Sequence, residues 1–170
     1  TDTVVIPLPA LDETSKPPTP CPTTLSVVAA GRLTEQKGFD ILIKAFAQVR
    51  RALPQAHLTI CGEGEERRSL EQLVKRYKLE DGVRLVGYVD NIRPYLDTNA
   101  IFVLSSRREG YGAVLIEALE AGRYAVTTDC TPAVYDIFND GLCGKVVPPN
   151  NPQALAEGLV QALCNRQDIT

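Results

Sequence analysis

Two glutamates stand eight positions apart on either side of a glycine-rich turn. Glu109 directly precedes Gly110, and Glu117 lies in the apolar, helix-compatible run that follows Gly112. Carboxylates in such a place can accept hydrogen bonds from hydroxyl groups or take part in acid–base chemistry. A purely structural interpretation is also available, because the glycines can simply form a tight turn and Glu117 can be a solvated helix residue.

A pair of carboxylates could also act as the acid and the nucleophile of a glycoside hydrolase. If a helix begins near Gly112, Glu117 lies about 7.5 Å along its axis, because each residue rises ~1.5 Å. A retaining hydrolase holds its two carboxyl groups roughly 5–5.5 Å apart, so the spacing disfavours that chemistry, and an inverting pair stays as an alternative.

The residues before Glu109 predict a buried strand that ends in polar side chains. The run 100–104 is short, apolar and rich in β-formers, and the polar residues 105–108 follow it. A second polar cluster, 31–38, follows the apolar run 25–30 and precedes an amphipathic helical pattern. In open α/β sheets, ligands bind at the carboxyl ends of the strands. We therefore expect the two clusters to line one crevice, which favours a site over a turn.

The pattern along the chain predicts an alternation of strands and helices. Strand-like runs recur at 25–30, 57–61, 83–86, 100–104, 124–127 and 145–147. The clearest helical patterns are 38–53, 65–77 and a last helix that starts at Asn151-Pro152, an N-cap followed by a first-turn proline. Such alternation implies right-handed parallel βαβ units. The expected fold is a doubly wound, Rossmann-like α/β domain with a predominantly parallel sheet and helices on both faces.

Composition excludes several classes of protein. The 170 residues fit one domain with its own core, and the net charge of −3 argues against a nucleic-acid partner. The five cysteines show no Cys-x-x-Cys spacing, so we expect reduced thiols and no metal site. No apolar run approaches the roughly 20 residues of a membrane-spanning helix. We expect a cytoplasmic location, with peripheral attachment to the inner face of the membrane as an option for the full-length protein.

The beginning of the chain differs from the rest. Residues 1–24 hold six of the twelve prolines. A stretch of this composition is typical of an extended linker. We expect residues 1–24 to be an interdomain linker and residues 25–170 to be the domain that follows it, with an N-terminal domain outside this chain.

Four motifs together resemble those of the group 1, family-four retaining glycosyltransferases, in order and spacing over roughly residues 25–160. They are Gly31-Arg32-Leu33 with residues 35–40, Cys61-Gly62-Glu63-Gly64, residues 105–112, and residues 115–119. The resemblance implies the two-domain B-type fold, GT-B, of which this chain would be the C-terminal, nucleotide-sugar-binding half. Val5-Ile6-Pro7 resembles the junction with the interdomain linker.

The resemblance also implies roles for individual residues. Arg32 and Lys37 match the basic pair on the donor diphosphate, and Glu109 matches the carboxylate against the transferred sugar; these three are the expected catalytic residues. Glu117 matches the acceptor of the ribose hydroxyls. The other donor-binding residues that the resemblance implies are Gly31, Gly62, Tyr88, Gly110, Tyr111, Gly112 and Ala113. Tyr88 could stack on the base or only cover the edge of the sheet.

The implied activity is transfer of a sugar, with retained configuration, from a nucleotide diphosphate sugar to a glycan or lipid-linked acceptor. A UDP-sugar is the favoured donor, with GDP- and ADP-sugars as alternatives, and no cofactor or metal is expected. The acceptor would bind the missing N-terminal domain, so this fragment alone would be inactive. His57, the single histidine, is expected to be structural.

The sequence departs from the family pattern in one segment, and this departure favours a different function. Residues 129–136 contain no glycine, and Asp136 stands where the family usually has a glutamate. Glycine lets a backbone approach a phosphate closely, so its absence bears on donor binding. The alternative is a noncatalytic module that binds a sugar nucleotide or a protein. An NAD site is disfavoured, because position 67 is Arg where the dinucleotide fingerprint needs Gly.

Overall fold

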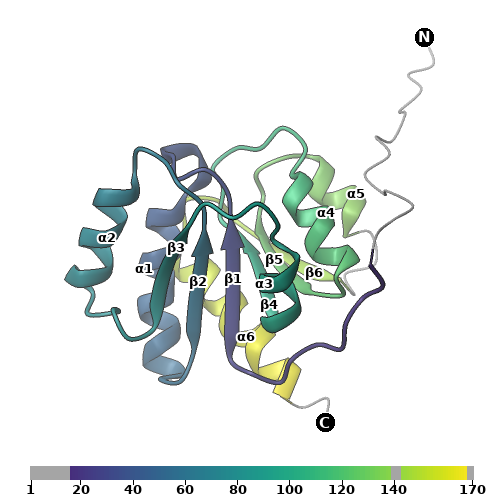
Figure 1. Ribbon diagram of the computed structural model, residues 1–170, viewed down its shortest axis with the longest axis horizontal. Coiled ribbons are helices and arrows are strands. Elements are labelled where there is room, and N and C mark those ends of the chain that lie inside the picture. Colours follow the sequence, from purple (N-terminus) through teal and green to yellow (C-terminus); the bar gives the residue numbers. More distant parts are fainter. Residues whose placement is uncertain (1–15, 139–142, 168–170) are drawn as a thin grey trace.

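The computed structural model describes residues 16–138 and 143–167, and within them six strands form one parallel sheet (Figure 1). The strand order is β3-β2-β1-β4-β5-β6. The strands are β1 (Ser26–Ala30), β2 (His57–Cys61), β3 (Val83–Gly87), β4 (Ile101–Leu104), β5 (Tyr124–Thr128) and β6 (Gly144–Val147). Each agrees with a predicted run to within one residue at either end. The prediction of a doubly wound α/β fold is confirmed, and this sheet is parallel throughout.

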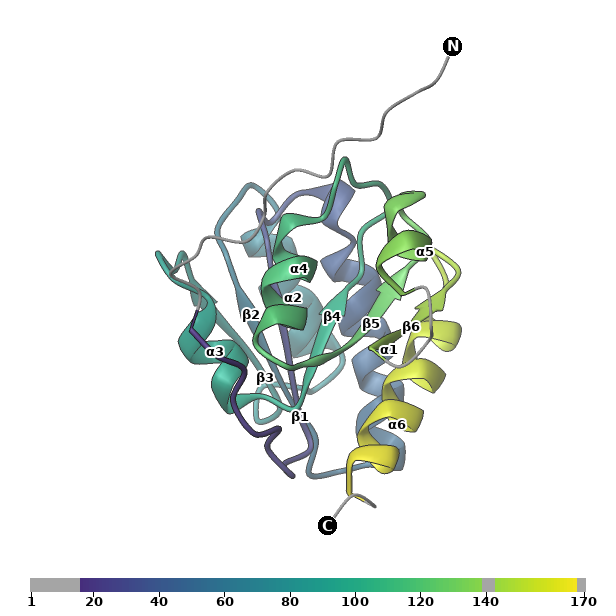
Figure 2. The same cartoon turned by 90° about the vertical axis from the view of Figure 1, so that its right-hand side faces the viewer.

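Helices cover both faces of the sheet (Figures 1 and 2). One face packs against α1 (Phe39–Ala52), α2 (Arg67–Arg76) and α6 (Pro152–Gln167), with α1 and α6 side by side. The other packs against α3 (Arg93–Thr98), α4 (Ala113–Glu120) and α5 (Ala133–Ile137). Strand β1 shows why two cores form: Val27 and Ala29 enter one, and Val28 enters the other, because successive strand residues point to opposite faces.

Local signals in the sequence set the helix boundaries. Asn151 accepts a hydrogen bond from the backbone of Ala154 at 2.9 Å, which is the predicted cap of α6. Helix α2 begins at Arg67, two residues later than the pattern predicts, with Glu66 as its N-cap. The N–H of Glu66 donates to the carbonyl of Leu33 in a neighbouring loop, and the carbonyl of Glu66 accepts the first helical hydrogen bond, from Leu70.

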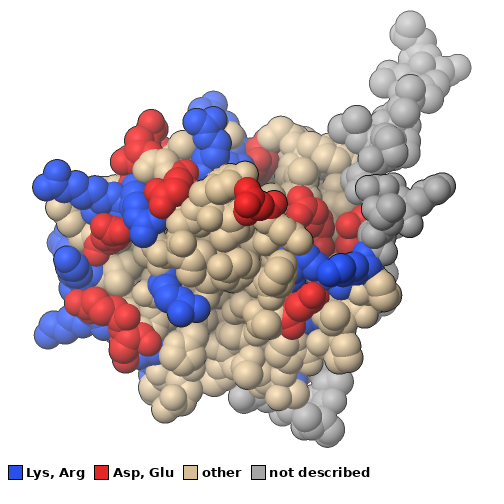
Figure 3. Space-filling view, viewed as in Figure 1, with Lys and Arg blue, Asp and Glu red and all other residues tan. Residues whose placement is uncertain are grey.

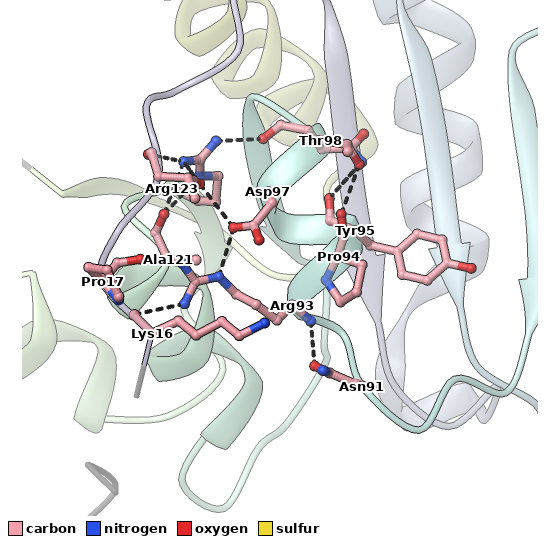
Figure 4. Close-up of polar contacts among 12 residues, drawn as sticks. Lys16, Pro17, Asn91, Arg93, Pro94, Tyr95, Asp97, Thr98, Ala121 and Arg123 are labelled. Atoms are coloured by element: carbon pink, nitrogen blue, oxygen red, sulfur yellow. Dashed lines mark hydrogen bonds and ion pairs between the residues drawn. The ribbon is translucent and has the colours of Figure 1, made fainter. Parts of the chain in front are cut away.

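The described part of the proline-rich stretch, residues 16–24, lies along α3 before β1 begins (Figures 1 and 2). Two arginines hold it there (Figure 4). Arg123, only 2% exposed, donates to the side chain of Thr19 at 2.9 Å, and Arg93 donates to the carbonyl of Lys16 at 2.9 Å. Val5-Ile6-Pro7, which resembles a family junction, lies outside the described residues.

The surface in the view of Figure 1 carries mixed charge. Figure 3 shows acidic and basic side chains interspersed over α2, so no field of one sign covers this face. None of the helices in the described ranges is long and apolar enough to cross a membrane. The five cysteines are all free.

Candidate functional site

The strand order reverses between β1 and β4, and the loops after these two strands meet at that point. Arg107 forms a bidentate ion pair with Asp40, with both N···O distances at 2.9 Å. The backbone N–H of Arg107 also donates to Gln36 at 2.8 Å, and the Ser105 hydroxyl donates to the carbonyl of Lys37 at 3.0 Å. The two polar clusters of the sequence therefore form one edge of the molecule, at the switch point where such sheets bind ligands.

The Arg107–Asp40 pair is a fixed structural joint. Burial alone raises the pKa of the Asp40 carboxyl, but the hydrogen bonds and the charge of Arg107 outweigh it and hold that pKa below its ordinary value of 3.8. The same contacts raise the pKa of Arg107 above its ordinary value. Both groups are therefore ionised at neutral pH.

Two glycines allow the loops to approach each other closely. Gly38 ends a 3-10 turn, Glu35–Lys37, in the left-handed region with φ 65°, and a Cβ there would overlap the carbonyl oxygen of Ser105. Gly62, with φ 150°, lies against the carbonyl oxygen of Gly31 in the same manner. Only glycine fits both the backbone conformation and the space at these positions.

A cavity of about 530 Å³ opens at this edge, between the ends of β1, β2 and β3 and the start of α4. Its wall includes six residues that matter here: Gly31, Arg32, Gly62, Glu63, Tyr88 and Glu117. Five of them were expected in the donor site, and Glu63 belongs to the Gly62-Glu63-Gly64 motif. Tyr88, whose two expected roles are stacking on a base and covering the sheet edge, is 74% exposed at the cavity wall.

Lys37 and Glu109 form an ion pair beside this cavity. The Nζ atom of Lys37 lies 2.5 Å from Oε1 of Glu109, and the side chains are 24% and 9% exposed. The Lys37 stem fills the space next to Gly31, since its Cδ lies 3.4 Å from the position of a Cβ on Gly31. The pair is therefore joined to the cavity wall through Gly31.

Arg32 and Glu117 line the cavity itself. The Arg32 side chain is exposed, and it has no ion-pair partner in the described part of the chain. Burial raises the pKa of Glu117 above its ordinary value of 4.5, and the negative charge of Glu120 adds to the shift. A cation without an ion-pair partner among the described residues and a carboxylate with a raised pKa thus face the same space.

The turn between Glu109 and α4 presents backbone N–H groups. Gly112 adopts the left-handed conformation with φ 74°, and α4 begins at Ala113, close to where the sequence predicts it. Among the described residues, the N–H groups of Gly110, Tyr111 and Gly112 donate to no backbone acceptor. Free amides at a helix start suit an anion or a hydroxyl-bearing ligand.

The 129–136 loop braces this turn. The N–H of Glu109 donates to the carbonyl of Cys130 at 3.0 Å, and the Thr131 hydroxyl donates to the carbonyl of Gly110 at 3.2 Å. Thr131-Pro132 directly precedes α5, but no side chain caps this helix. The Thr131 hydroxyl instead fixes the backbone of the candidate site.

His57 lies at the amino-terminal ends of the strands, opposite the candidate site. It starts β2, is exposed, and lines a separate cavity with residues at the start of β3. The structure therefore separates it from the other candidate residues. Within the described ranges, no group of three or more His, Cys, Asp and Glu side chains could hold a metal ion.

Several structural residues of the site were not singled out from the sequence. The sequence pattern placed Ser106 and Arg107 directly after a strand. It indicated neither the ion pair of Arg107 with Asp40 nor the burial of the Ser106 hydroxyl. The network of Arg93, Asp97 and Arg123 was also missed (Figure 4). Arg123 stands directly before the apolar run of β5, and a cation in that position was the available signal.

The fold and the site define the class of protein. The domain has the fold of GT-B glycosyltransferases: it superposes on S. aureus TarM, solved with UDP, with a TM-score of 0.86 and 24% identity. The match covers 91% of this chain and 31% of TarM. The family model described as "Glycosyl transferases group 1" matches residues 13–168. The chain therefore belongs to the group 1 glycosyltransferase family.

Two curated relatives agree with this assignment. One is the GtfA subunit of a UDP-N-acetylglucosamine–peptide N-acetylglucosaminyltransferase from Streptococcus agalactiae, 29% identical over 85% of this chain. Another is the lipopolysaccharide core biosynthesis glycosyltransferase LpsE from Rhizobium meliloti, 32% identical over 82% of this chain. The chain spans only 29% and 39% of the lengths of these two proteins.

Proposed function

We propose that this chain is the donor-binding half of a retaining glycosyltransferase. In this proposal residues 1–24 are the interdomain linker, residues 25–170 bind a nucleotide diphosphate sugar, and the acceptor binds a second domain. The observation that carries it is the meeting of Arg32 and Glu117 in one cavity, with the Lys37–Glu109 pair joined to its wall.

The four side chains suit the parts of such a donor. Arg32 offers a planar fork and Lys37 a mobile charge to the diphosphate. Glu117 accepts hydrogen bonds from the ribose hydroxyls, and the free amides of residues 110–112 lie beside the sugar and phosphate. Glu109 accepts from the sugar hydroxyls. Without donor, Lys37 and Glu109 neutralise each other at 2.5 Å, so the diphosphate competes with Glu109 for the lysine.

The reaction requires the chain to position the donor and to stabilise the charge that develops on it. Negative charge grows on the diphosphate as the bond to the sugar breaks, and Arg32 and Lys37 stabilise it. Two unit charges 4 Å apart attract by about 4 kcal/mol at an effective dielectric constant of 20. In a retaining reaction without a protein nucleophile, the acceptor oxygen bonds to the sugar on the face that the diphosphate leaves, and an oxygen of the leaving diphosphate takes the acceptor's proton. The protein then contributes by orienting the donor.

A UDP-sugar is the favoured donor. TarM was solved with UDP, and the Streptococcus agalactiae relative is named for UDP-N-acetylglucosamine. GDP- and ADP-sugars remain alternatives. The acceptor class is a glycan or a lipid-linked glycan, which the name of the LpsE relative supports. A cytoplasmic location, with or without peripheral membrane attachment, stays a prediction.

Titration calorimetry with UDP, GDP, ADP and their sugar conjugates tests the proposal. We expect one nucleotide to bind, and Glu117→Ala to abolish its binding. Glu157→Ala is the matched control, because Glu157 is an exposed glutamate on α6, away from the cavity. We also expect no sugar transfer by this chain alone. Absence of binding by every nucleotide would support the alternative of a noncatalytic protein-binding module.

A further inference from the structure

Ser106 is buried beneath the Lys37–Glu109 pair. Its side chain is fully buried, and its hydroxyl donates to Oε1 of Glu109 at 2.6 Å. The carbonyl of Ser106 in turn accepts a hydrogen bond from the hydroxyl of Thr128, on the neighbouring strand β5, also at 2.6 Å. Ser106 is therefore held to the sheet through its carbonyl and to the Glu109 carboxylate through its hydroxyl.

The two oxygens of the Glu109 carboxylate have different surroundings. Lys37 and Ser106 both donate to Oε1, and no described residue donates to Oε2. Among the described residues, the one buried side-chain oxygen or nitrogen without a partner is Oε1 of Glu120. Oε2 of Glu109 is not among such buried atoms, and 9% of the Glu109 side chain is exposed.

This asymmetry depends on Ser106. Lys37 alone could approach either oxygen, because an ammonium on a flexible stem has three donors and no preferred plane. The Ser106 hydroxyl comes from a buried position and donates to Oε1, so it selects the rotation of the carboxylate. A buried, charge-assisted hydrogen bond is strong enough to hold that rotation.

We propose that Ser106 is a positioning residue, which fixes the Glu109 carboxylate so that Oε2 faces the hydroxyl groups of the donor sugar. This inference rests on the proposed function and deepens it. It assigns Ser106 to the sugar end of the donor. Nucleoside diphosphate binding without a sugar does not need it.

Calorimetry with UDP and with UDP-N-acetylglucosamine and UDP-glucose tests this split. We expect Ser106→Ala to weaken binding of the preferred UDP-sugar about tenfold, the size of one lost hydrogen bond to a charged group. The affinity for UDP should stay unchanged. In a Glu109→Ala background the Ser106→Ala substitution should have no further effect, because its acceptor is gone.

Thr127→Val is the matched control. Thr127 is equally buried, and its hydroxyl donates only to the neighbouring carbonyl of Thr128, at 3.1 Å. This variant should bind UDP and the UDP-sugar like the wild type. Equal losses of UDP and UDP-sugar in Ser106→Ala, or additive effects of Ser106→Ala and Glu109→Ala, would overturn the proposal, since both indicate a general role in loop stability.

Crystal structures of the wild type and of Ser106→Ala decide the question without a ligand. We expect the Glu109 carboxylate to rotate or to occupy two orientations in the variant. An unchanged orientation, with Lys37 still on Oε1, overturns the proposal. If the wild type binds no nucleotide, the proposed function fails, and these two structures still test what Ser106 does to Glu109.

Discussion

Replacement of Gly62 by alanine tests whether the site depends on the close approach of two loops. An added Cβ would overlap the carbonyl oxygen of Gly31, and φ at this position is 150°, which L-residues rarely adopt. The N–H of Gly62 also donates to Gly87 at 2.8 Å, so the residue cannot move without breaking a contact to β3. Gly62→Ala must therefore separate the loops that form the cavity wall.

The expected cost follows from these two effects. A strained backbone conformation costs of order 1–3 kcal/mol, and overpacking costs about as much. A combined loss of about 3 kcal/mol in the free energy of unfolding lowers the melting temperature of a chain this long by about 6–12 °C, at roughly 2–4 °C per kcal/mol. Binding of UDP should be lost as well, because Gly31 and Gly62 both line the cavity.

Gly110→Ala is the control in thermal unfolding. A Cβ on Gly110 meets no atom within 4 Å, and its φ is not positive. This variant should melt within about 2 °C of the wild type, as surface substitutions usually do. If Gly62→Ala also melts within that range, the overlap with Gly31 is absorbed at no cost, and the argument that the site requires glycine there is refuted.

Three further predictions concern the charged residues. Arg123→Met should reduce the free energy of unfolding by about 3 kcal/mol in urea titrations, because it leaves buried acceptors unpaired; a loss under about 1 kcal/mol would contradict this. The folded pKa of Asp40 is lowered, so its pair with Arg107 stabilises the fold above the ordinary pKa, and this contribution of about 1 kcal/mol is lost as pH falls through the lowered value. Acid unfolding of Asp40→Asn should accordingly be less steep than that of the wild type. The pKa of Glu117 is raised, so UDP binding should weaken as pH falls through a midpoint above 4.5, and Glu120→Gln should move that midpoint lower in calorimetry.

The fold could be predicted because its signals are local and repeated. The central strands β1, β4 and β5 are largely buried on both sides, so they appear as apolar runs between turn residues, and the outer strands keep enough apolar positions to be found as well. The runs 57–61 and 124–127 are found in this way, and the structure places them as β2 and β5. The short helices α3 and α5 carry few turns of periodicity, and the pattern did not delimit them. The parallel topology then follows, because long crossovers leave few other arrangements.

The site could be predicted only in part, because its geometry depends on contacts between distant residues. The pattern brings polar residues to one edge of the sheet, but it contains no information on which polar groups pair. Lys37 and Glu109 are 72 positions apart and share a hydrogen bond. Ser106 and Thr128 are joined across two strands, and nothing in the spacing of either one indicates the other.

Arg107 illustrates the physical limit most clearly. In the sequence it is one of two adjacent arginines after a strand, beside a carboxylate, and each could contact an anionic ligand. In the structure Arg107 is fully engaged by Asp40 and by the carbonyl of Glu35, whereas Arg108 is exposed. A guanidinium already held by a bidentate carboxylate would have to give up that pair to bind a phosphate, so the loop uses one arginine to fix its own shape. Arg107 is therefore not available to a ligand, although identity and spacing alone could not separate it from Arg32 and Lys37.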